Sequence, residues 1–375
     1  MIKTNMKPFR PGYFPSVLVA DENASAKRHC SGDGLTLLSG AMPFIRKLYF
    51  ILPAVLLSGW TAVLPISVAQ AAFALCPSGE MRIFVPASGD GQLSCIYDLA
   101  RTAGQEKLDL SFVTQPLPGR GGSYATSRLL DEKGDGCFLA AVQLPSFLFL
   151  AESPDRMYRA GDIVLAGIFA SLPNALWVAD DSPFQTPADL VNYARTLNET
   201  PDGNFTLAGV GSYTDQHLAT LQFNRAAGVQ SIYRPMAGSA EAAAAVLKGD
   251  AAACWGYALA PDSMPGMRAL AVAAPKRSTA LPGVPTLYEA KIDMENISVF
   301  GLGMTAAASE KKQAQVGAAL ETIFTGERFQ EELAALGATP LQVPFDRLRV
   351  YLGNWRGLVR KIHEQYSLIP GSPYR

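Results

Sequence analysis

The chain has 375 residues, of which 49% are hydrophobic and 17% are charged, and its formal net charge is −1. A chain of this composition can bury a large core, which excludes an intrinsically disordered protein. Its Lys and Arg residues are scattered and form no long basic block, so we expect no nucleic-acid partner.

An apolar run at residues 48–63 predicts export from the cytoplasm. Arg46 and Lys47 precede the run, and small-x-small patterns follow it at residues 69–71 and 72–74, as in a cleaved secretory signal. A retained membrane anchor is the competing interpretation, because the run with its flanks approaches the ~20 residues that a membrane span needs. Export followed by cleavage predicts a periplasmic mature protein.

Two N-terminal segments are therefore set apart from the fold. Residues 42–74 are the predicted signal peptide, which starts with Met-Pro-Phe-Ile-Arg-Lys at Met42. Residues 1–41 show no sustained periodicity, so we interpret them as a non-native or disordered leader upstream of the true translation start.

Strand-like and helix-like patterns alternate in the mature part of the chain. Strands are predicted at residues 81–85, 108–113, 138–142, 163–168, 175–178, 205–208, 251–255, 269–273 and 299–304. Helices are predicted at residues 95–103, 124–132, 239–247 and 327–336, after Thr186 and Ser309, and along the apolar row Leu348, Tyr351, Trp355, Leu358 and Ile362. This alternation is typical of an α/β protein with mainly parallel sheets.

The mature part is longer than one typical core, which predicts two lobes. We assign residues 75–174 to lobe I and residues 175–299 to lobe II. Residues 300–375 are expected to return to lobe I and to end in helices that pack on it.

Four cysteines remain after removal of the signal region: Cys76, Cys95, Cys137 and Cys254. An even number in an oxidising compartment allows disulfides, although buried free thiols are the alternative. We prefer a Cys76–Cys137 bond, because each residue lies just before a predicted strand at the same end of a parallel sheet. Cys95 and Cys254 are expected to face the cleft between the lobes, and whether they pair stays open.

Sequence signatures of catalysis are missing. The chain has no Gly-x-Ser-x-Gly elbow, Walker loop or His-Glu-x-x-His pair, and Gly89-x-Gly91 lacks the third glycine of a dinucleotide fingerprint. We therefore predict a protein that is not an enzyme and that uses no cofactor or metal.

Several short motifs occur in a fixed order along the chain. They are Pro-Gly-Arg-Gly-Gly at residues 118–122, Gly-Asp-Gly-Cys-Phe-Leu at 134–139, Thr-Asp-Gln-His-Leu at 214–218, Ala-Gly-Ser-Ala at 237–240, Leu-Lys-Gly-Asp at 247–250, and the proline-rich loop at 275–290. In this order the motifs resemble those of the periplasmic receptors of tripartite tricarboxylate transporters, the Bug-type solute-binding proteins. The resemblance covers residues 81–344.

The resemblance implies a fold and a function. It implies a two-lobed periplasmic binding protein of type II-like α/β fold, in which each lobe is a mainly parallel sheet flanked by helices and the ligand lies in the cleft between them. Such a receptor captures a small organic acid, works as a monomer and delivers the acid to membrane transporter subunits. A periplasmic sensor that docks on a signalling partner is the alternative.

The resemblance also places the ligand on two loops that precede helices, where free N–H groups attract anions. The expected ligand residues are Ser88, Gly89, Asp90, Gly91 and Gln92 in the first loop, Gly211, Ser212, Tyr213 and Thr214 in the second, His217 in the following helix, and Trp255. Each of Thr214, His217 and Trp255 has a structural alternative, as an N-cap, a hydrogen-bonding residue and a core residue. Asp90 adds negative charge and Tyr213 adds bulk, so we expect weak binding of citrate and succinate.

Overall fold

The structure is a computed structural model that describes residues 75–87, 92–108, 110–201 and 203–366. The predicted leader at residues 1–41 and the predicted signal peptide at residues 42–74 lie outside the described residues. No helix within the described ranges is long and apolar enough to span a membrane.

Lobe I is built on a parallel arrangement of three strands. Its strands are β1 (Glu80–Val85), β2 (Ser111–Pro116) and β3 (Phe138–Leu144), and its first helices are α2 (Gln92–Leu108), α3 (Ser123–Leu130) and α4 (Ser146–Glu152). β1 pairs with β2 and with β3, both in parallel. The sequence pattern predicted these elements except α4, and α2 begins three residues earlier and ends five residues later than its predicted range.

Two long antiparallel strands join the lobes. They are β4 (Ile163–Ala179) and β9 (Ile297–Thr305), which pair from Ile163 opposite Thr305 to Pro173 opposite Ile297. The sequence predicted two separate strands at 163–168 and 175–178, whereas the structure has one strand of 17 residues. The pairing with β9 explains the difference, because it keeps the intervening residues extended through a proline. The lobe boundaries that we expect near residues 174 and 299 fall within β4 and β9.

Lobe II has a mixed sheet with helices on both faces. Its elements are α5 (Pro187–Asn198), β5 (Thr206–Val210), α6 (Asp215–Ala227), β6 (Ile232–Met236), α7 (Ser239–Leu247), β7 (Ala253–Tyr257) and β8 (Met267–Val272). β5 runs parallel to β6 and β7, and the second half of β4 pairs antiparallel with β7 and β8. The predicted capping box is confirmed: the Thr186 side chain accepts from the backbone N–H of Asp189, and the Asp189 carboxylate accepts from that of Thr186.

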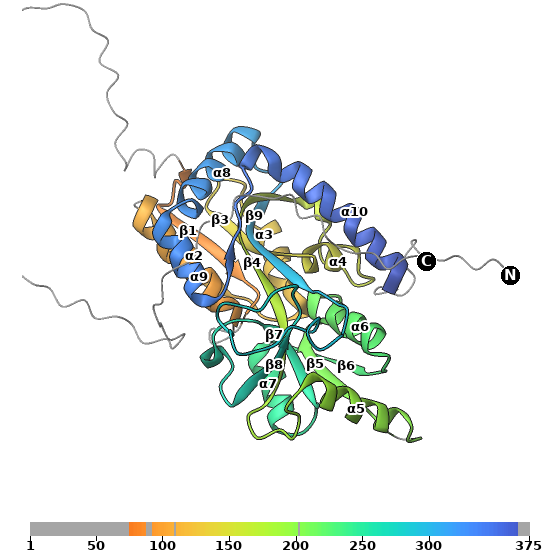
Figure 1. The fold of residues 1–375 in the computed structure, drawn as a ribbon. Coiled ribbons are helices and arrows are strands. Elements are labelled where there is room, and N and C mark those ends of the chain that lie inside the picture. Colours follow the sequence, from red (N-terminus) through yellow and green to blue (C-terminus); the bar gives the residue numbers. More distant parts are fainter. Residues whose placement is uncertain (1–74, 88–91, 109, 202, 367–375) are drawn as a thin grey trace, which may run out of the picture.

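The C-terminal segment packs on the elements of lobe I. It comprises α8 (Glu310–Phe324), α9 (Glu327–Leu336), β10 (Thr339–Pro340) and α10 (Leu348–Tyr366). One apolar cluster packs α2, α8 and α9 on one face of the lobe I sheet, and a second packs α3, α4 and α10 on the other. Figure 1 shows these helices around the first lobe, with β5, β6, α5 and α7 in the second. The predicted two-lobed α/β fold is confirmed.

The described cysteines include a bonded pair, Cys76 and Cys137, and one free buried thiol, Cys254. Cys76 and Cys137 form a disulfide with Cα atoms 4.9 Å apart, which confirms the preferred pairing. Cys254 is free and fully buried in β7, and burial raises the pKa of its thiol to about 12. The expectation that Cys254 faces the cleft is therefore wrong, because the helix α7 packs over this part of β7, and no Cys95–Cys254 bond forms.

Candidate functional site

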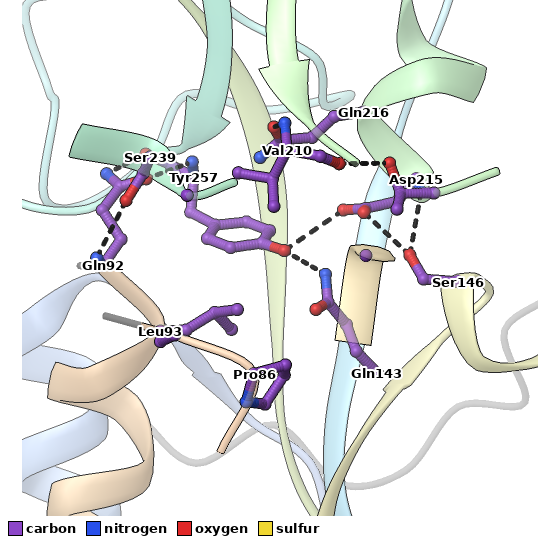
Figure 2. A pocket seen from close by; sticks show the side chains of 14 residues that line it. Pro86, Gln92, Leu93, Gln143, Ser146, Val210, Asp215, Gln216, Ser239 and Tyr257 are labelled. Carbon is purple, nitrogen blue, oxygen red and sulfur yellow. Dashed lines mark hydrogen bonds between the residues drawn. The ribbon is translucent and has the colours of Figure 1, made fainter. Parts of the chain in front are cut away.

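A pocket lies between the lobes, where β1, β3, β5 and β7 end (Figure 2). It contains about 490 Å³ of empty volume, including the part that is open to solvent. Its lining residues are Pro86, Ala87, Gln92, Leu93, Gly121, Gln143, Ser146, Val210, Thr214, Asp215, Gln216, Gly238, Ser239 and Tyr257. This is the position that ligands take in open parallel sheets, where strands lead through loops into helices.

Three helices begin at the pocket wall. α2 begins at Gln92, α6 begins at Asp215 after its N-cap Thr214, and α7 begins at Ser239. The first turn of a helix presents unpaired N–H groups and the positive end of the helix dipole, so it favours an anion. No side chain caps the start of α7, because its N-cap is Gly238.

The Gln92 side chain crosses from lobe I to lobe II. Its Oε1 accepts a hydrogen bond from the backbone N–H of Tyr257 at 2.8 Å, and its Nε2 donates to the Tyr257 carbonyl at 3.1 Å. The same nitrogen donates to Ser263 Oγ at 2.9 Å, and the backbone N–H of Gln92 donates to Ser239 Oγ at 3.2 Å. Gln92 is 1% exposed, so these bonds hold the lobes together in a closed arrangement.

Two glycines form the closest backbone approach between the lobes. Gly121 and Gly211 both have left-handed backbone angles, with φ of 64° and 65°. A Cβ atom built on Gly211 would lie 2.5 Å from the Gly121 Cα, and one built on Gly121 would lie 2.7 Å from Thr214 Cγ2. Only residues without a side chain allow the lobes to meet here.

Asp215 is the one charged side chain in the described lining of the pocket, and it is 2% exposed. Ser146 Oγ donates to its Oδ1 at 2.8 Å, while the Asp215 backbone N–H donates to the same Ser146 oxygen at 2.9 Å. Asn174 Nδ2 donates to Oδ2 at 3.0 Å, and Ser298 Oγ also donates to Oδ2. The first residue of α6 is thereby tied to α4 and to both strands that join the lobes.

Tyr257 connects this carboxylate to the lobe I sheet, as Figure 2 shows. Its hydroxyl donates to Asp215 Oδ2 at 3.4 Å and accepts from Gln143 Nε2. Burial first, and the charge of Asp215 second, raise the pKa of Tyr257 well above its ordinary value. Tyr257 therefore stays neutral and acts as a hydrogen-bond donor to Asp215.

The loop between β5 and α6 is fixed by its own side chains. Thr214 Oγ1 donates to the Val210 carbonyl at 2.8 Å and accepts from the His217 N–H at 3.4 Å, and Gln216 Oε1 accepts from the Val210 N–H at 2.7 Å. The Thr214 hydroxyl proton is thus already used within the protein.

His217 lies behind this loop. Its Nδ1 accepts from the Tyr213 N–H at 3.2 Å, and its ring stacks on Tyr233 with centroids 4.5 Å apart. Burial lowers the pKa of His217 from its ordinary 6.5 to about 4, so the imidazole is neutral at pH 7 and brings no positive charge to the site.

A match to a protein-family model shows which family this chain belongs to. The model of the tripartite tricarboxylate transporter family receptor matches residues 99–345. The chain belongs to this receptor family. The resemblance that the sequence motifs indicated is confirmed.

Named relatives of the receptor agree with this assignment. A UPF0065 protein from Cupriavidus necator is 25% identical over 274 residues, which cover 72% of this chain and 83% of the relative. The protein BugT of Bordetella pertussis is 25% identical over 306 residues, which cover 76% of this chain and 90% of the relative.

Solved structures share the fold of the receptor. A Rhodopseudomonas palustris protein with adipate has a TM-score of 0.69 and 22% identity, and the match covers 77% of this chain and 97% of that one. MatC from the same organism, with bound malate, has a TM-score of 0.64 and 20% identity, and the match covers 75% and 98%. Both similarities show the two-lobed architecture.

The structure places the predicted ligand residues of the receptor in three groups. Gln92 and Thr214 line the pocket. Ser88, Gly89, Asp90 and Gly91 lie outside the described residues, so their role stays a prediction. Gly211, Ser212, Tyr213, His217 and Trp255 are absent from the described lining of the pocket.

Two of these expectations are corrected for physical reasons. Trp255 is 0% exposed and packs edge-on against Phe223, with ring centroids 6.1 Å apart, so it is a core residue of lobe II. Tyr213 packs against the apolar cluster that contains Phe147 and Leu218, so it does not narrow the pocket.

The sequence motifs could have revealed some of the missed lining residues. Asp215 and Gln216 stand inside the motif at residues 214–218, and Ser239 begins a predicted helix. No sequence pattern near Gln143 or Tyr257 indicates a pocket residue, because both reach the site through hydrogen bonds to residues that are distant in the sequence. Among the described residues, no group of three or more His, Cys, Asp or Glu side chains could hold a metal.

Proposed function

We propose that this receptor captures a small carboxylate in the interlobe pocket and delivers it to the membrane subunits of a tripartite tricarboxylate-type transporter. One observation carries the proposal: the N-termini of three helices converge on a pocket between two lobes that close on each other. Helix ends at such a pocket can hold a carboxylate group through their free N–H groups and dipoles.

The ligands of similar structures support the same class of substrate. One neighbour was solved with adipate and another with malate, and both molecules are carboxylates. The present chain offers an amide and a hydroxyl at its pocket, from Gln143 and Ser239, which suit hydrogen bonds to carboxylate oxygens. The proposal includes secretion to the periplasm with cleavage of residues 42–74, a monomeric mature protein and no catalytic step.

Thermal denaturation of the mature protein, residues 75–375, against a panel of organic acids tests the proposal. A ligand that binds only the folded state stabilises it by about 2.7 kcal/mol at a concentration of 100 times Kd. We expect at least one small acid to raise the midpoint in a concentration-dependent way. A panel without any such acid would overturn the proposed ligand class.

A pair of variants tests the role of the α7 terminus. Ser239→Pro removes both the hydroxyl and the first N–H of α7, whereas Ser239→Ala removes only the hydroxyl; proline is tolerated at this first helical position. We expect the proline variant to bind the acid more weakly than the alanine variant, by roughly 1–3 kcal/mol for a lost bond to a charged group. Equal affinities would place the carboxylate elsewhere in the pocket.

Uptake measurements test delivery. Cells that lack the receptor, and cells that lack the membrane subunits, should both fail to accumulate the labelled acid. Normal uptake in either strain contradicts the transport role.

A further inference from the structure

The pocket wall already contains a carboxylate. Asp215 lines the pocket, is the first residue of α6, and is almost completely buried. A carboxylate in the first turn of a helix occupies the place that an external anion would take, because it interacts with the same positive end of the helix.

The partners of Asp215 leave its charge in place. Its oxygens accept hydrogen bonds from Ser146, Asn174, Ser298 and Tyr257, which are all neutral donors. It forms no ion pair with any described Lys, Arg or His, and the described pocket lining contains no basic residue. The described wall of the pocket therefore carries a net negative charge.

The start of α7 differs from that of α6. α7 has no side-chain cap, and the acidic residue of its first turn, Glu241, is exposed to solvent. One ligand carboxylate can therefore interact with the start of α7, whereas the start of α6 is already neutralised by the protein. A second ligand carboxylate would share a small closed space with Asp215, where repulsion between like charges is strong because little water screens it.

The hydrogen bonds to Asp215 use its acceptor capacity. Its Oδ1 accepts from Ser146, whereas Oδ2 accepts the other three hydrogen bonds. Two carboxylate oxygens offer about four acceptor sites in total, two on each oxygen. These four donors match that capacity, so Asp215 acts on a ligand through its charge.

We infer that Asp215 serves as a built-in anion of the pocket and selects a ligand with one carboxylate and a neutral or cationic group over a dicarboxylate. The inference rests on the proposed function, because it assumes that the pocket binds a small acid. It gives Asp215 a role in specificity in addition to its role in joining the lobes.

Calorimetry with acids of equal length and different charge tests this selectivity. The mature protein is titrated with hexanoate, adipate and 6-aminohexanoate, and with butyrate, succinate and 4-aminobutyrate, at fixed pH and ionic strength. We expect each diacid to bind at least about tenfold more weakly than the monoacid or the amino acid of the same length.

Two variants separate charge from structure. Asp215→Asn removes the charge, and we expect it to raise the ratio of diacid to monoacid affinity about tenfold. Ser298→Ala removes one neutral donor from Asp215 but keeps the charge, so it should leave this ratio unchanged whatever it does to the absolute affinities. A folded Asp215→Asn protein with the wild-type ratio would overturn the inference.

The titrations of the wild-type protein with monoacids, diacids and amino acids test the inference even if Asp215→Asn does not fold. Tighter binding of the diacids by the wild-type protein overturns the inference and leaves the proposed function standing. Failure of every acid to bind overturns the proposed function, and the inference with it.

Discussion

Closure of the two lobes depends on a contact between two glycines, and a substitution at Gly211 tests this. Alanine at this position would place its Cβ 2.5 Å from the Cα and 2.8 Å from the N of Gly121, which are backbone atoms and cannot rotate away. Carbon atoms in contact need about 3.5–4.0 Å, so the lobes must separate by roughly 1 Å at this point. We expect Gly211→Ala to weaken acid binding by about 10- to 100-fold, since ligand and lobes would no longer fit together.

Gly228 provides a matched control for the backbone cost. It also has a φ of 65°, at the end of α6, but a Cβ on Gly228 meets nothing within 4 Å. Both alanine variants should lose about 1 kcal/mol of stability, because a left-handed conformation is costly for residues other than glycine. Only Gly211→Ala should also lose affinity.

Three measurements on both proteins check the reasoning. Urea unfolding reports the shared loss of stability, calorimetry reports the affinity for an acid found in the thermal screen, and small-angle scattering reports closure through the radius of gyration. Equal affinities of the Gly211→Ala and Gly228→Ala proteins would refute the argument that the glycine contact controls closure.

Three further predictions concern stability. Burial holds the pKa of His217 at about 4 in the folded protein against 6.5 in the unfolded chain, so stability should fall as the pH falls from about 6.5 towards 4. The free energy of unfolding, measured in urea, should be higher at pH 7.5 than at pH 4.5, and His217→Gln should reduce this difference by roughly 2 kcal/mol. An unchanged difference in the variant would contradict the burial argument. Replacing Cys76 and Cys137 by Ser should cost about 2–5 kcal/mol, because their bond closes a separation of 61 residues; reductant should lower the urea midpoint of the wild type more than that of the variant. Thr214→Val should cost about 1 kcal/mol, since it removes the N-cap of α6, and a wild-type urea midpoint would show that this cap is dispensable.

The sequence determined the features that depend on neighbouring residues. The start of α5 is set by Thr186, Pro187 and Asp189, which bond within four residues of each other. The start of α6 at Thr214 is local in the same way. Alternation of such elements, together with the ordered motifs, was sufficient to predict the α/β fold and the receptor family.

The tertiary structure alone decided which side chains form the site. Asp215 meets Asn174, Ser146, Tyr257 and Ser298 at separations of 41, 69, 42 and 83 residues, and no local pattern records such distances. The sheet must first bring β3, β4, β7 and β9 together before these groups can bond.

Two aromatic residues of β7 illustrate the limit. Trp255 and Tyr257 stand two positions apart in one strand, and only Trp255 was expected to contact the ligand, from the family resemblance. Packing against Phe223 buries Trp255 in the core of lobe II, while Tyr257 lies at the strand end and reaches the Asp215 carboxylate. Position relative to the edge of the sheet decided their roles, because only the end of a parallel strand opens toward the space between the lobes.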